Sequence, residues 1–212
     1  MTTLAGPRRA RSEDSETRSR LLDAAEGLML REGYAAVTAR RIAAAAGVTA
    51  PLVHYYFGPL DDLFIALLAR RTDEGIELQR SAMSGPRPLT ALWEFCSGTA
   101  SVRYTTEFMA LAHHREAIRS ALLTAIRQTN DAAIICLEAA ATDGRVDLGG
   151  ADAAAVVVSV VSSARGIAMQ RVLGFTHGHD EALSLVKRLI DQIETTPPAT
   201  PPRANQSARR RR

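Results

Sequence analysis

Residues 38–49 read TARRIAAAAGVT, and this stretch decides the fold of the N-terminal part of the 212-residue chain. Threonine caps helix N-termini, because its side-chain oxygen accepts a backbone N–H of the first turn, so Thr38 and Thr49 each predict a helix start. The alanines of 39–46 favour helix, and Gly47 permits the left-handed conformation that ends one. Two short helices joined by a tight turn are therefore predicted.

Helix signals extend on both sides of this stretch. Ser15 or Thr17 predicts a cap for a preceding helix that ends at Gly33, and residues 1–14 are expected to form a disordered arm. The hydrophobic residues of this helix recur at helical spacing: Leu21, Leu22, Ala25, Leu28 and Met29. Gly58-Pro59 ends the helix that follows Thr49. A fourth helix then spans about 60–81, with Asp61 and Asp62 in its first turn, where the helix dipole favours acids.

The rest of the chain also predicts helices, so the expected fold class is all-α. Residues 89–141 indicate two or three helices, 151–173 a small-residue apolar helix, and 180–194 an amphipathic one. The β-branched run 156–161 favours a strand by composition, but its Ala and Gly flanks and the absence of a partner strand favour helix. Residues 195–212 predict a Pro/Arg-rich disordered tail.

Composition and charge set limits on the class of protein. Hydrophobic residues make up 46% and charged residues 23%, which is ordinary for a soluble protein. Two cysteines without zinc-site spacing, no apolar run of membrane-spanning length and no signal-peptide core predict a cytoplasmic protein with no cofactor and no membrane partner. The net charge of +3 comes from the tail, whose five arginines leave 21 basic and 23 acidic residues elsewhere.

A local window carries more information than the net charge. Residues 33–60 contain no Asp or Glu but include Arg40, Arg41 and His54. A segment that approaches phosphates avoids acids in this way, although an Ala-rich buried hairpin also lacks charge. Three short helices with a turn at Gly47 match a helix-turn-helix, whose second helix enters the DNA major groove. Its packing residues would be Ile42, Val48, Val53 and Phe57.

In these residues the chain resembles the TetR family of bacterial regulators. The resemblance covers residues 17–68 and rests on Gly33-Tyr34, Thr38-x-x-x-Ile42-Ala43-x-x-Ala46-Gly47-Val48-Thr49, Tyr56-Phe57 and Asp62-Leu63. It implies a DNA-binding set that contacts phosphates and base edges: Thr38, Arg40, Arg41, Thr49, Ala50, Pro51, Leu52, His54, Tyr55 and Tyr56. His54 stands where the family usually has Tyr, and Leu60 where it often has Lys. The Arg-rich tail is one compensation for the lost phosphate contact.

The resemblance also implies the domain plan and the partners. An arm at 1–14 and a helix-turn-helix domain at 15–68 precede a ligand-binding and dimerisation domain at 69–194 and the tail at 195–212. The partners would be a palindromic double-stranded operator, a small-molecule inducer and a second copy of the chain. Dimerisation has independent support, because residues 151–173 are apolar on nearly all sides, although an intrachain bundle would also bury them.

A ligand pocket is expected where aromatic residues concentrate, because such pockets are mostly apolar with a few polar groups. The candidates are Trp93, Phe95, Cys96, Arg103, Tyr104, Phe108, Met109, His113 and Arg165. Trp93, Cys96 and Tyr104 share one face if a single helix spans them. This set suggests an apolar or aromatic ligand, and plain core packing is the alternative for each residue. A repressor released by this ligand through movement of the fourth helix is the expected mechanism.

Two other classes of function are a metal-dependent enzyme and an architectural DNA-binding protein. A metal-dependent enzyme would need clusters such as His113-His114 with Glu107 and Glu116, or His177-Gly178-His179-Asp180. Adjacent histidines on a helix point apart, Asp180 is expected to cap the last helix beside solvent-exposed histidines, and no nucleophile–base motif or phosphate loop is present. The prediction is therefore no enzyme and no metal. An architectural DNA binder without a ligand would leave about 125 residues without a task.

Overall fold

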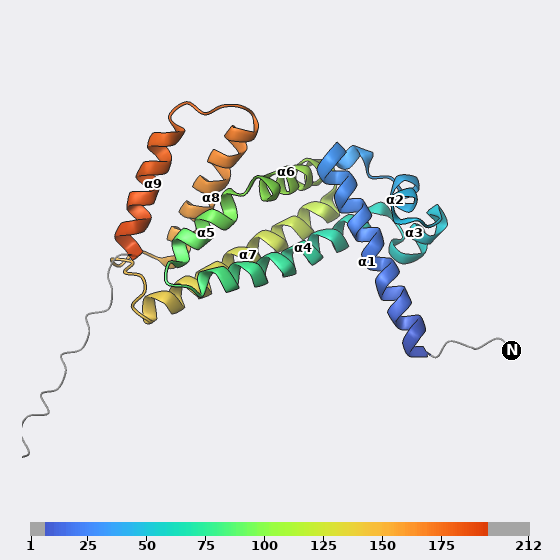
Figure 1. Ribbon diagram of the computed structural model, residues 1–212, viewed down its shortest axis with the longest axis horizontal. Helices are drawn as coiled ribbons and strands as arrows, with labels where there is room; N and C mark the ends of the chain where they lie inside the picture. Colours follow the sequence, from blue (N-terminus) through green and yellow to red (C-terminus); the bar gives the residue numbers. More distant parts are fainter. Residues whose placement is uncertain (1–6, 195–212) are drawn as a thin grey trace, which may run out of the picture.

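The computed structural model describes residues 7–194 and is all-helical over that range. The DNA-binding candidates lie at one end of the elongated molecule and the last two helices at the other (Figure 1). The helices are α1 (Pro7–Glu32), η1 (Tyr34–Ala36), α2 (Ala39–Ala46), α3 (Ala50–Phe57), α4 (Leu60–Met83), α5 (Pro88–Ser97), α6 (Thr99–His114), α7 (Glu116–Thr142), α8 (Ala153–Val172) and α9 (His179–Glu194). The all-α prediction is confirmed, and the β-branched run 156–161 lies within α8.

The first helix departs from the prediction at its N-terminus. Helix α1 begins at Pro7, so the expected arm over 1–14 and the cap at Ser15 or Thr17 are wrong from residue 7 onward. Proline is favoured in a first turn, and the arginines and alanine that follow are good helix formers, so polar composition alone did not indicate disorder. Residues 1–6 and the predicted tail at 195–212 lie outside the described residues.

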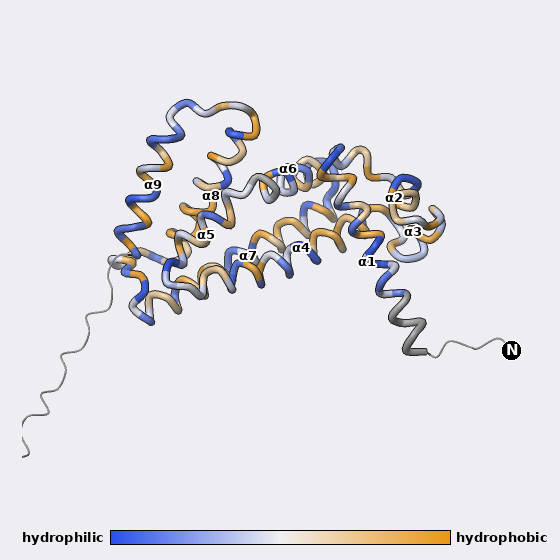
Figure 2. Tube along the Cα trace, in the orientation of Figure 1, coloured by the Kyte–Doolittle hydropathy of each residue, from blue (hydrophilic) through white to orange (hydrophobic). Residues whose placement is uncertain are grey.

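Two hydrophobic clusters hold the molecule together. The first joins the N-terminal helices to α4, α6 and α7 through buried residues that include Leu21, Ile42, Phe64 and Phe108. The second joins α5, α7, α8 and α9 around Leu89 and neighbouring side chains. Helices α4 and α7 run side by side between the two ends, and hydrophobic residues recur along both of them (Figure 2). These long helices connect the DNA-binding end mechanically to the rest of the molecule.

Helix α9 is fixed at both ends by polar contacts. Near its C-terminus, Glu194 accepts hydrogen bonds from the backbone N–H groups of Leu89 and Thr90, at 2.6 and 3.0 Å, and so caps α5. At its N-terminus, His179 is buried and its Nε2 lies 2.9 Å from Oε1 of Gln170. The expectation of a solvent-exposed His179 and an Asp180 cap is therefore wrong. The helix starts one residue earlier, which turns His179 back onto the end of α8.

The length and composition of α8 correct the expectation that no segment is long and apolar enough to cross a membrane. An 18-residue window within Ala153–Val172 has a mean hydropathy of 1.4, which is enough for a membrane span, and the bent pair α3–α4 passes the same test if counted as one span. Only 33% of that α8 window is buried. The composition argument against any such segment was thus wrong, because small and β-branched residues raise hydropathy without forming an obvious apolar run. A core helix of a soluble protein passes the same test when it is mostly buried, and in the single chain this window is not.

Candidate DNA-binding surface and ligand cavity

The turn between α2 and α3 is built as the sequence predicts. The hydroxyl of Thr38 accepts a hydrogen bond from the backbone N–H of Arg41 at 3.3 Å, which caps α2. Gly47 adopts φ +69° and ψ +34°, the left-handed conformation that favours glycine. The backbone N–H of Val48 then donates to the carbonyl of Ala43 at 2.9 Å. These contacts reverse the chain within three residues, and α3 can begin at Ala50.

Apolar packing fixes the angle between α2 and α3. Ile42, Val53 and Phe57 are buried in the first hydrophobic cluster, and Val48 is half-buried against it. The guanidinium of Arg18 on α1 lies 5.0 Å from the centre of the Phe57 ring, a distance suited to a cation–π contact. The four packing residues predicted from the sequence therefore hold the two helices, and the opposite face of α3 is left to solvent.

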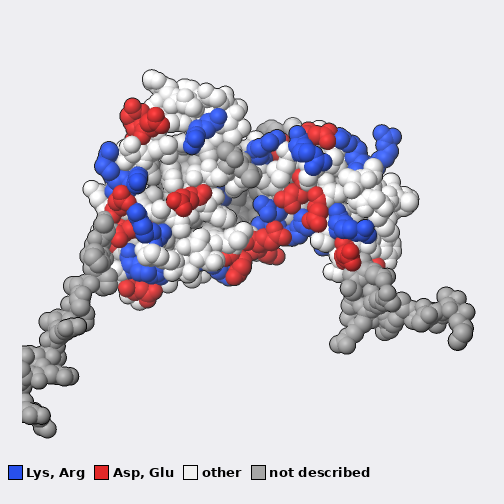
Figure 3. Space-filling view, viewed as in Figure 1, with Lys and Arg blue, Asp and Glu red and all other residues white. Residues whose placement is uncertain are grey.

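Three of the DNA-binding candidates are free on the surface and three are engaged. Arg40 is exposed and forms no ion pair with any described residue, Thr49 is exposed, and the Tyr55 side chain is 76% exposed. Basic side chains gather at this end of the molecule, with acidic ones beside them (Figure 3). The engaged residues are Arg41, His54 and Tyr56, and their contacts differ.

The engaged residues are tied to neighbouring helices or turns. One guanidinium nitrogen of Arg41 lies 2.7 Å from both carboxylate oxygens of Glu32. The hydroxyl of Tyr56 donates to Asp14 at 2.9 Å, and this bond raises the pKa of Tyr56. The Nδ1 atom of His54 lies 3.0 Å from the carbonyl of Gly58. Arg41 and Tyr56 thus connect the motif to α1, which leaves Arg40 and Tyr55 as its most available polar side chains.

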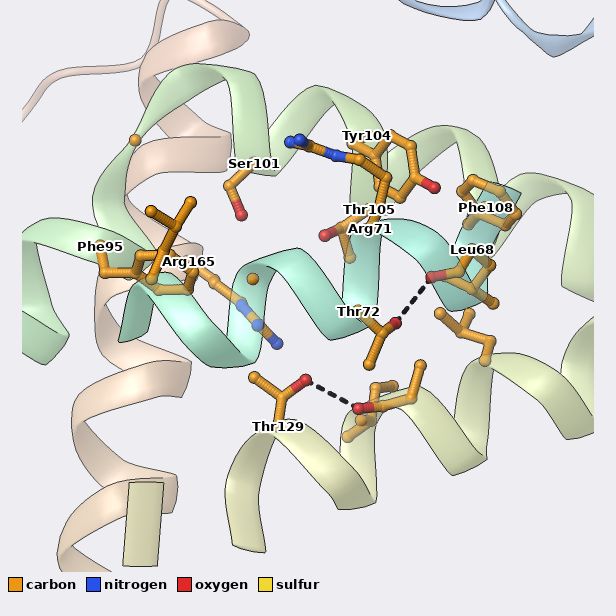
Figure 4. Close-up of a pocket in the computed structure, with 16 residues that line it drawn as sticks. Leu68, Arg71, Thr72, Phe95, Ser101, Tyr104, Thr105, Phe108, Thr129 and Arg165 are labelled. Atoms are coloured by element: carbon orange, nitrogen blue, oxygen red, sulfur yellow. Dashed lines mark hydrogen bonds between the residues drawn. The ribbon is translucent and has the colours of Figure 1, made fainter. Parts of the chain in front are cut away.

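A cavity of about 330 Å³ lies between α4, α5, α6, α7 and α8 (Figure 4). Leu68 and Phe108 lie at one end of the cavity (Figure 4), and Leu122 is also part of its lining. The cavity also contains polar groups from α6 and α8, which are Ser101, Thr105 and Arg165. A mostly apolar lining with a few polar groups is typical of small-molecule sites, and the volume lies at the lower end of their usual range.

Two polar atoms in the cavity wall are buried and have no hydrogen-bond partner among the described residues. They are the hydroxyl of Tyr104 and the Nε of Arg165. Burial raises the pKa of Tyr104, so this hydroxyl stays protonated. Burial also raises the pKa of Cys96, and the charge of Arg165 lowers it in part, which places Arg165 near that thiol. Buried polar atoms normally have hydrogen-bond partners, and at these two positions the cavity wall supplies none.

The other cation of the cavity wall is already neutralised. The guanidinium of Arg71 lies 3.1 Å from Glu26 and 3.3 Å from Glu74, and its carbon lies 5.7 Å from the centre of the Tyr104 ring. Gly75 completes this side of the wall, where an added Cβ would lie 3.8 Å from Phe95. A glycine inside a helix costs about 1 kcal/mol relative to alanine, and here it leaves the cavity open.

The helices that line the cavity also contact the N-terminal helices. On α6, Glu107 accepts a hydrogen bond from the backbone N–H of Tyr34 at 2.7 Å. On α4, Arg70 lies 2.6 Å from Asp23 and 3.0 Å from Glu26 of α1. Arg115, between α6 and α7, pairs with Asp61 in the first turn of α4. These contacts connect α4 and α6 to α1 and η1, which precede α2.

Comparison with known proteins agrees with this arrangement. Residues 21–67 match the family described as bacterial regulatory proteins of the tetR family. In this region the chain is similar to the TetR family. A relative from Brucella suis biovar 1 (strain 1330), the HTH-type transcriptional repressor BepR, is 37% identical over 87 residues. These residues are 40% of this chain and 42% of BepR, so the likeness spans less than half of that protein.

Solved structures extend the likeness to the whole TetR-type fold. The reduced form of E. coli NemR superposes with a TM-score of 0.71 at 19% identity, covering 85% of this chain and 99% of NemR. A transcriptional regulator from Saccharomonospora viridis in complex with choline gives 0.69 at 20% identity, covering 84% and 96%. The fold of an N-terminal helix-turn-helix followed by a larger helical region is thus confirmed.

The structure brings together only part of the ligand set predicted from the concentration of aromatic residues. Tyr104, Phe108, Phe95 and Arg165 line the cavity. Trp93 lies in a separate groove between α5 and α9, and Cys96 is buried in the second cluster. Three further candidates from α6 are exposed and lie outside the cavity, because they follow the opposite face of the helix: Arg103, Met109 and His113. The single helix assumed to span Trp93 and Tyr104 is wrong, since Gly98 adopts an extended conformation between α5 and α6.

The prediction from sequence missed the contributions of α4 and α7 to this cavity. Thr72, Gly75 and Thr129 have no distinguishing pattern in the sequence, and only Gly75, a glycine inside a helical run, was a usable signal. In the described part of the chain, no group of three or more His, Cys, Asp or Glu could hold a metal. Glu107 and Glu116, weighed as ligands, are bonded to Tyr34 and Arg119 instead.

Proposed function

We propose that this chain is a dimeric transcriptional repressor that leaves a palindromic operator when a small molecule fills the cavity. The observation that carries the proposal is the free face of α2 and α3, with Arg40, Thr49 and Tyr55 exposed on a tightly packed helix-turn-helix. An exposed arginine at this position suits a bidentate contact to guanine, and Thr49 and Tyr55 suit phosphate contacts. Ala50, Pro51 and Leu52 would lie closest to the groove.

A second copy of the chain would cover the apolar surface at the opposite end. Large hydrophobic side chains of α8 and α9 are about half exposed in the single chain, among them Val158, Met169, Leu185 and Leu189. Several large apolar side chains exposed on two consecutive helices are typical of a surface that a partner protein covers. Two-fold pairing of α8 and α9 would form a four-helix interface and place two recognition helices on successive half-sites. This pairing also favours a soluble, cytoplasmic role for α8 over a membrane span.

The link between ligand and DNA would run through α4. The border expected at residues 68 and 69 falls inside α4, which begins directly after the recognition helix and lines the cavity at Leu68, Thr72 and Gly75. A ligand that prefers one position of α4 changes the separation of the two DNA-binding domains, and linkage requires operator affinity to change in return. The choline bound to the Saccharomonospora viridis regulator supports a small-molecule effector for this fold.

Binding of the full-length protein to DNA tests this proposal. The probe is DNA that flanks its own coding region, followed by genomic fragments selected for binding, at physiological salt with excess competitor. We expect saturable binding to one palindromic site. Arg40→Ala weakens this binding about tenfold or more, since a good base contact contributes about 1–3 kcal/mol. Arg103→Ala is the matched control, because Arg103 is exposed on α6, away from α2 and α3.

Three results would contradict the repressor. They are the absence of any competitor-resistant site among the genomic fragments, an equal loss of affinity in Arg40→Ala and Arg103→Ala, and a monomer at the concentrations that shift DNA. A steep salt dependence without sequence preference would favour the architectural DNA binder instead. An enzyme has less support, because the carboxylates near His113 and His114 are bonded elsewhere.

A further inference from the structure

The cavity wall is electrostatically one-sided. Its charged residues are Arg71 and Arg165, and no Asp or Glu lines it. Arg71 is compensated by Glu26 and Glu74. Arg165 forms no ion pair and no hydrogen bond with any residue that the structure describes, and its Nε is buried. The cavity therefore holds one uncompensated positive charge.

Arg165 is partly buried, and its Nε is a buried atom without a hydrogen-bond partner among the described residues, which is costly. Arginine does not lose its proton, so it cannot become neutral as a buried lysine does. Arg165 comes from α8 and reaches across the cavity toward α4 and α7, with its guanidinium between Thr72 and Thr129 (Figure 4). The hydroxyls of these threonines donate to carbonyls of their own helices, so they do not need the guanidinium as a partner. The group that satisfies Arg165 is missing from the wall.

The remaining polar groups suit an acceptor-rich ligand. Ser101 and Thr105 point toward the centre of the cavity from α6, and neither hydroxyl donates a hydrogen bond to a described residue (Figure 4). The Tyr104 hydroxyl is buried and unpaired. A carboxylate accepts two parallel hydrogen bonds from a guanidinium and further bonds from hydroxyls. The apolar end at Leu68 and Phe108 would hold a short hydrocarbon or aromatic body.

We infer that the effector is a small organic acid whose carboxylate binds Arg165 and whose apolar body fills the end formed by Leu68 and Phe108. That the acid regulates DNA binding rests on the proposed function, whereas the preference for an acid concerns the cavity alone. A cationic ligand such as choline fits this wall poorly, because its positive charge would meet Arg165 and no carboxylate lines the cavity. The apolar or aromatic ligand predicted from the sequence thus gains one negatively charged group.

Calorimetry on the full-length protein at pH 7 tests the inference. The probes are two matched series, 4-phenylbutyrate with 4-phenylbutan-1-ol and 4-phenylbutylamine, and octanoate with octan-1-ol and octylamine. We expect at least one acid to bind about tenfold or more tightly than its alcohol, as a charge-assisted hydrogen bond predicts, and its amine to bind most weakly. Equal affinities within both series, preference for the amine, or no binding of either acid would overturn the inference.

Variants of Arg165 separate a ligand contact from a structural role. Arg165→Met should bring the acid down to the affinity of the alcohol, and Arg165→Lys should keep part of the preference. Arg171→Met is the control, because Arg171 is exposed on the same helix. In the ligand-free protein, Arg165→Met should unfold at the same temperature or higher, since it removes an uncompensated cation. A large drop in that temperature, or an acid preference that survives in Arg165→Met, would contradict the inference.

The two proposals fail in different ways. Calorimetry contains no DNA, so an acid preference without operator binding would refute the repressor and leave the cavity assignment standing. Operator binding without an acid preference would refute the acid and leave the repressor standing. With both present, the preferred acid should lower operator affinity in the wild type and not in Arg165→Met.

Discussion

The DNA-binding end and the cavity region differ in how completely their polar groups are satisfied. Five buried side-chain atoms have no hydrogen-bond partner in the described residues, and all lie at or beyond residue 70: Arg70 Nε, Gln79 Oε1, Tyr104 OH, Arg165 Nε and His179 Nδ1. In the helix-turn-helix, by contrast, Thr38, Arg41, His54 and Tyr56 each have a bonded partner. Unsatisfied buried atoms are costly, so their distribution is informative.

This difference indicates that the DNA-binding end is rigidly held, whereas the cavity region can change when a ligand binds. The DNA-binding end is held in one geometry, as a surface that must match the spacing of phosphates requires. The cavity region has unpaired hydrogen-bonding groups, empty volume and an interior glycine, and a bound ligand could use all three. A ligand that supplies the missing partners would stabilise one arrangement of α4, α6 and α8, which is the differential affinity that allostery needs.

The largest expected effect comes from a pair of core truncations, one in each hydrophobic cluster. Ile42 and Leu89 are both fully buried, Ile42 in the first cluster and Leu89 in the second. Ile42→Ala and Leu89→Ala should each lower the free energy of unfolding by about 2–5 kcal/mol. At a temperature where both variants are folded, only Ile42→Ala should lose operator affinity, because it loosens the angle between α2 and α3. Denaturant unfolding and gel shift measure the two quantities.

An equal loss of operator affinity in both variants would break the comparison. It would mean that the geometry of the DNA-binding end depends on the whole molecule, and that the helix-turn-helix is not fixed by its own packing.

The same contrast explains how far the sequence could predict this molecule. The helix-turn-helix is specified locally, by the capping residue Thr38, the turn residue Gly47 and hydrophobic residues close to them in the sequence, so its elements and packing residues were predictable from short windows. The cavity is assembled from five helices, and whether Met109 or Phe108 faces it depends on the rotation of α6 after the break at Gly98. The start of α1 at Pro7 was missed because polar helix formers and disordered arms have similar composition.

Arg165 shows what was within reach and what was not. An arginine in an otherwise small and apolar helix is a visible signal in the sequence, and Arg165 was among the predicted ligand residues. That it lacks a carboxylate partner depends on which residues α4, α6 and α7 place around it, and no pattern in the sequence contains that information.

An intermediate effect is expected at the contact between the two regions. Glu107 of α6 accepts the backbone N–H of Tyr34, which is partly buried. Glu107→Ala should lower the free energy of unfolding by about 1–3 kcal/mol, because it leaves that N–H without an acceptor. It should also reduce the effect of the ligand on operator affinity, since α6 loses its bond to the DNA-binding end. Glu107→Gln is the matched control, because its amide oxygen can still accept the bond.

If Glu107→Ala leaves the effect of the ligand on operator affinity unchanged, the signal does not pass through α6. The contacts of α4 with α1, through Arg70 with Asp23 and Glu26, would then be the remaining route.

The smallest expected effect compares two glycines inside helices, one in each region. Gly27 lies in α1, where an added Cβ would meet only the flexible end of Arg31, and Gly75 lies in α4 at the cavity wall. Both Gly27→Ala and Gly75→Ala should raise the free energy of unfolding by up to about 1 kcal/mol, because alanine restricts the unfolded chain and favours helix. Only Gly75→Ala should weaken the binding of 4-phenylbutyrate, since its methyl group occupies the cavity beside Phe95.

Unfolding in denaturant measures the stability of the two variants, and calorimetry measures their ligand affinity, in which they should differ. In α1 the glycine would be a replaceable residue, so stability rises and function is unchanged. In α4 the same gain in stability would come with a loss of ligand affinity, which is the pattern expected where a cavity is kept open at the expense of stability. Equal ligand affinity in both variants would show that the ligand does not use the space beside Gly75 and Phe95, and would confine it to Arg165 and the end formed by Leu68 and Phe108.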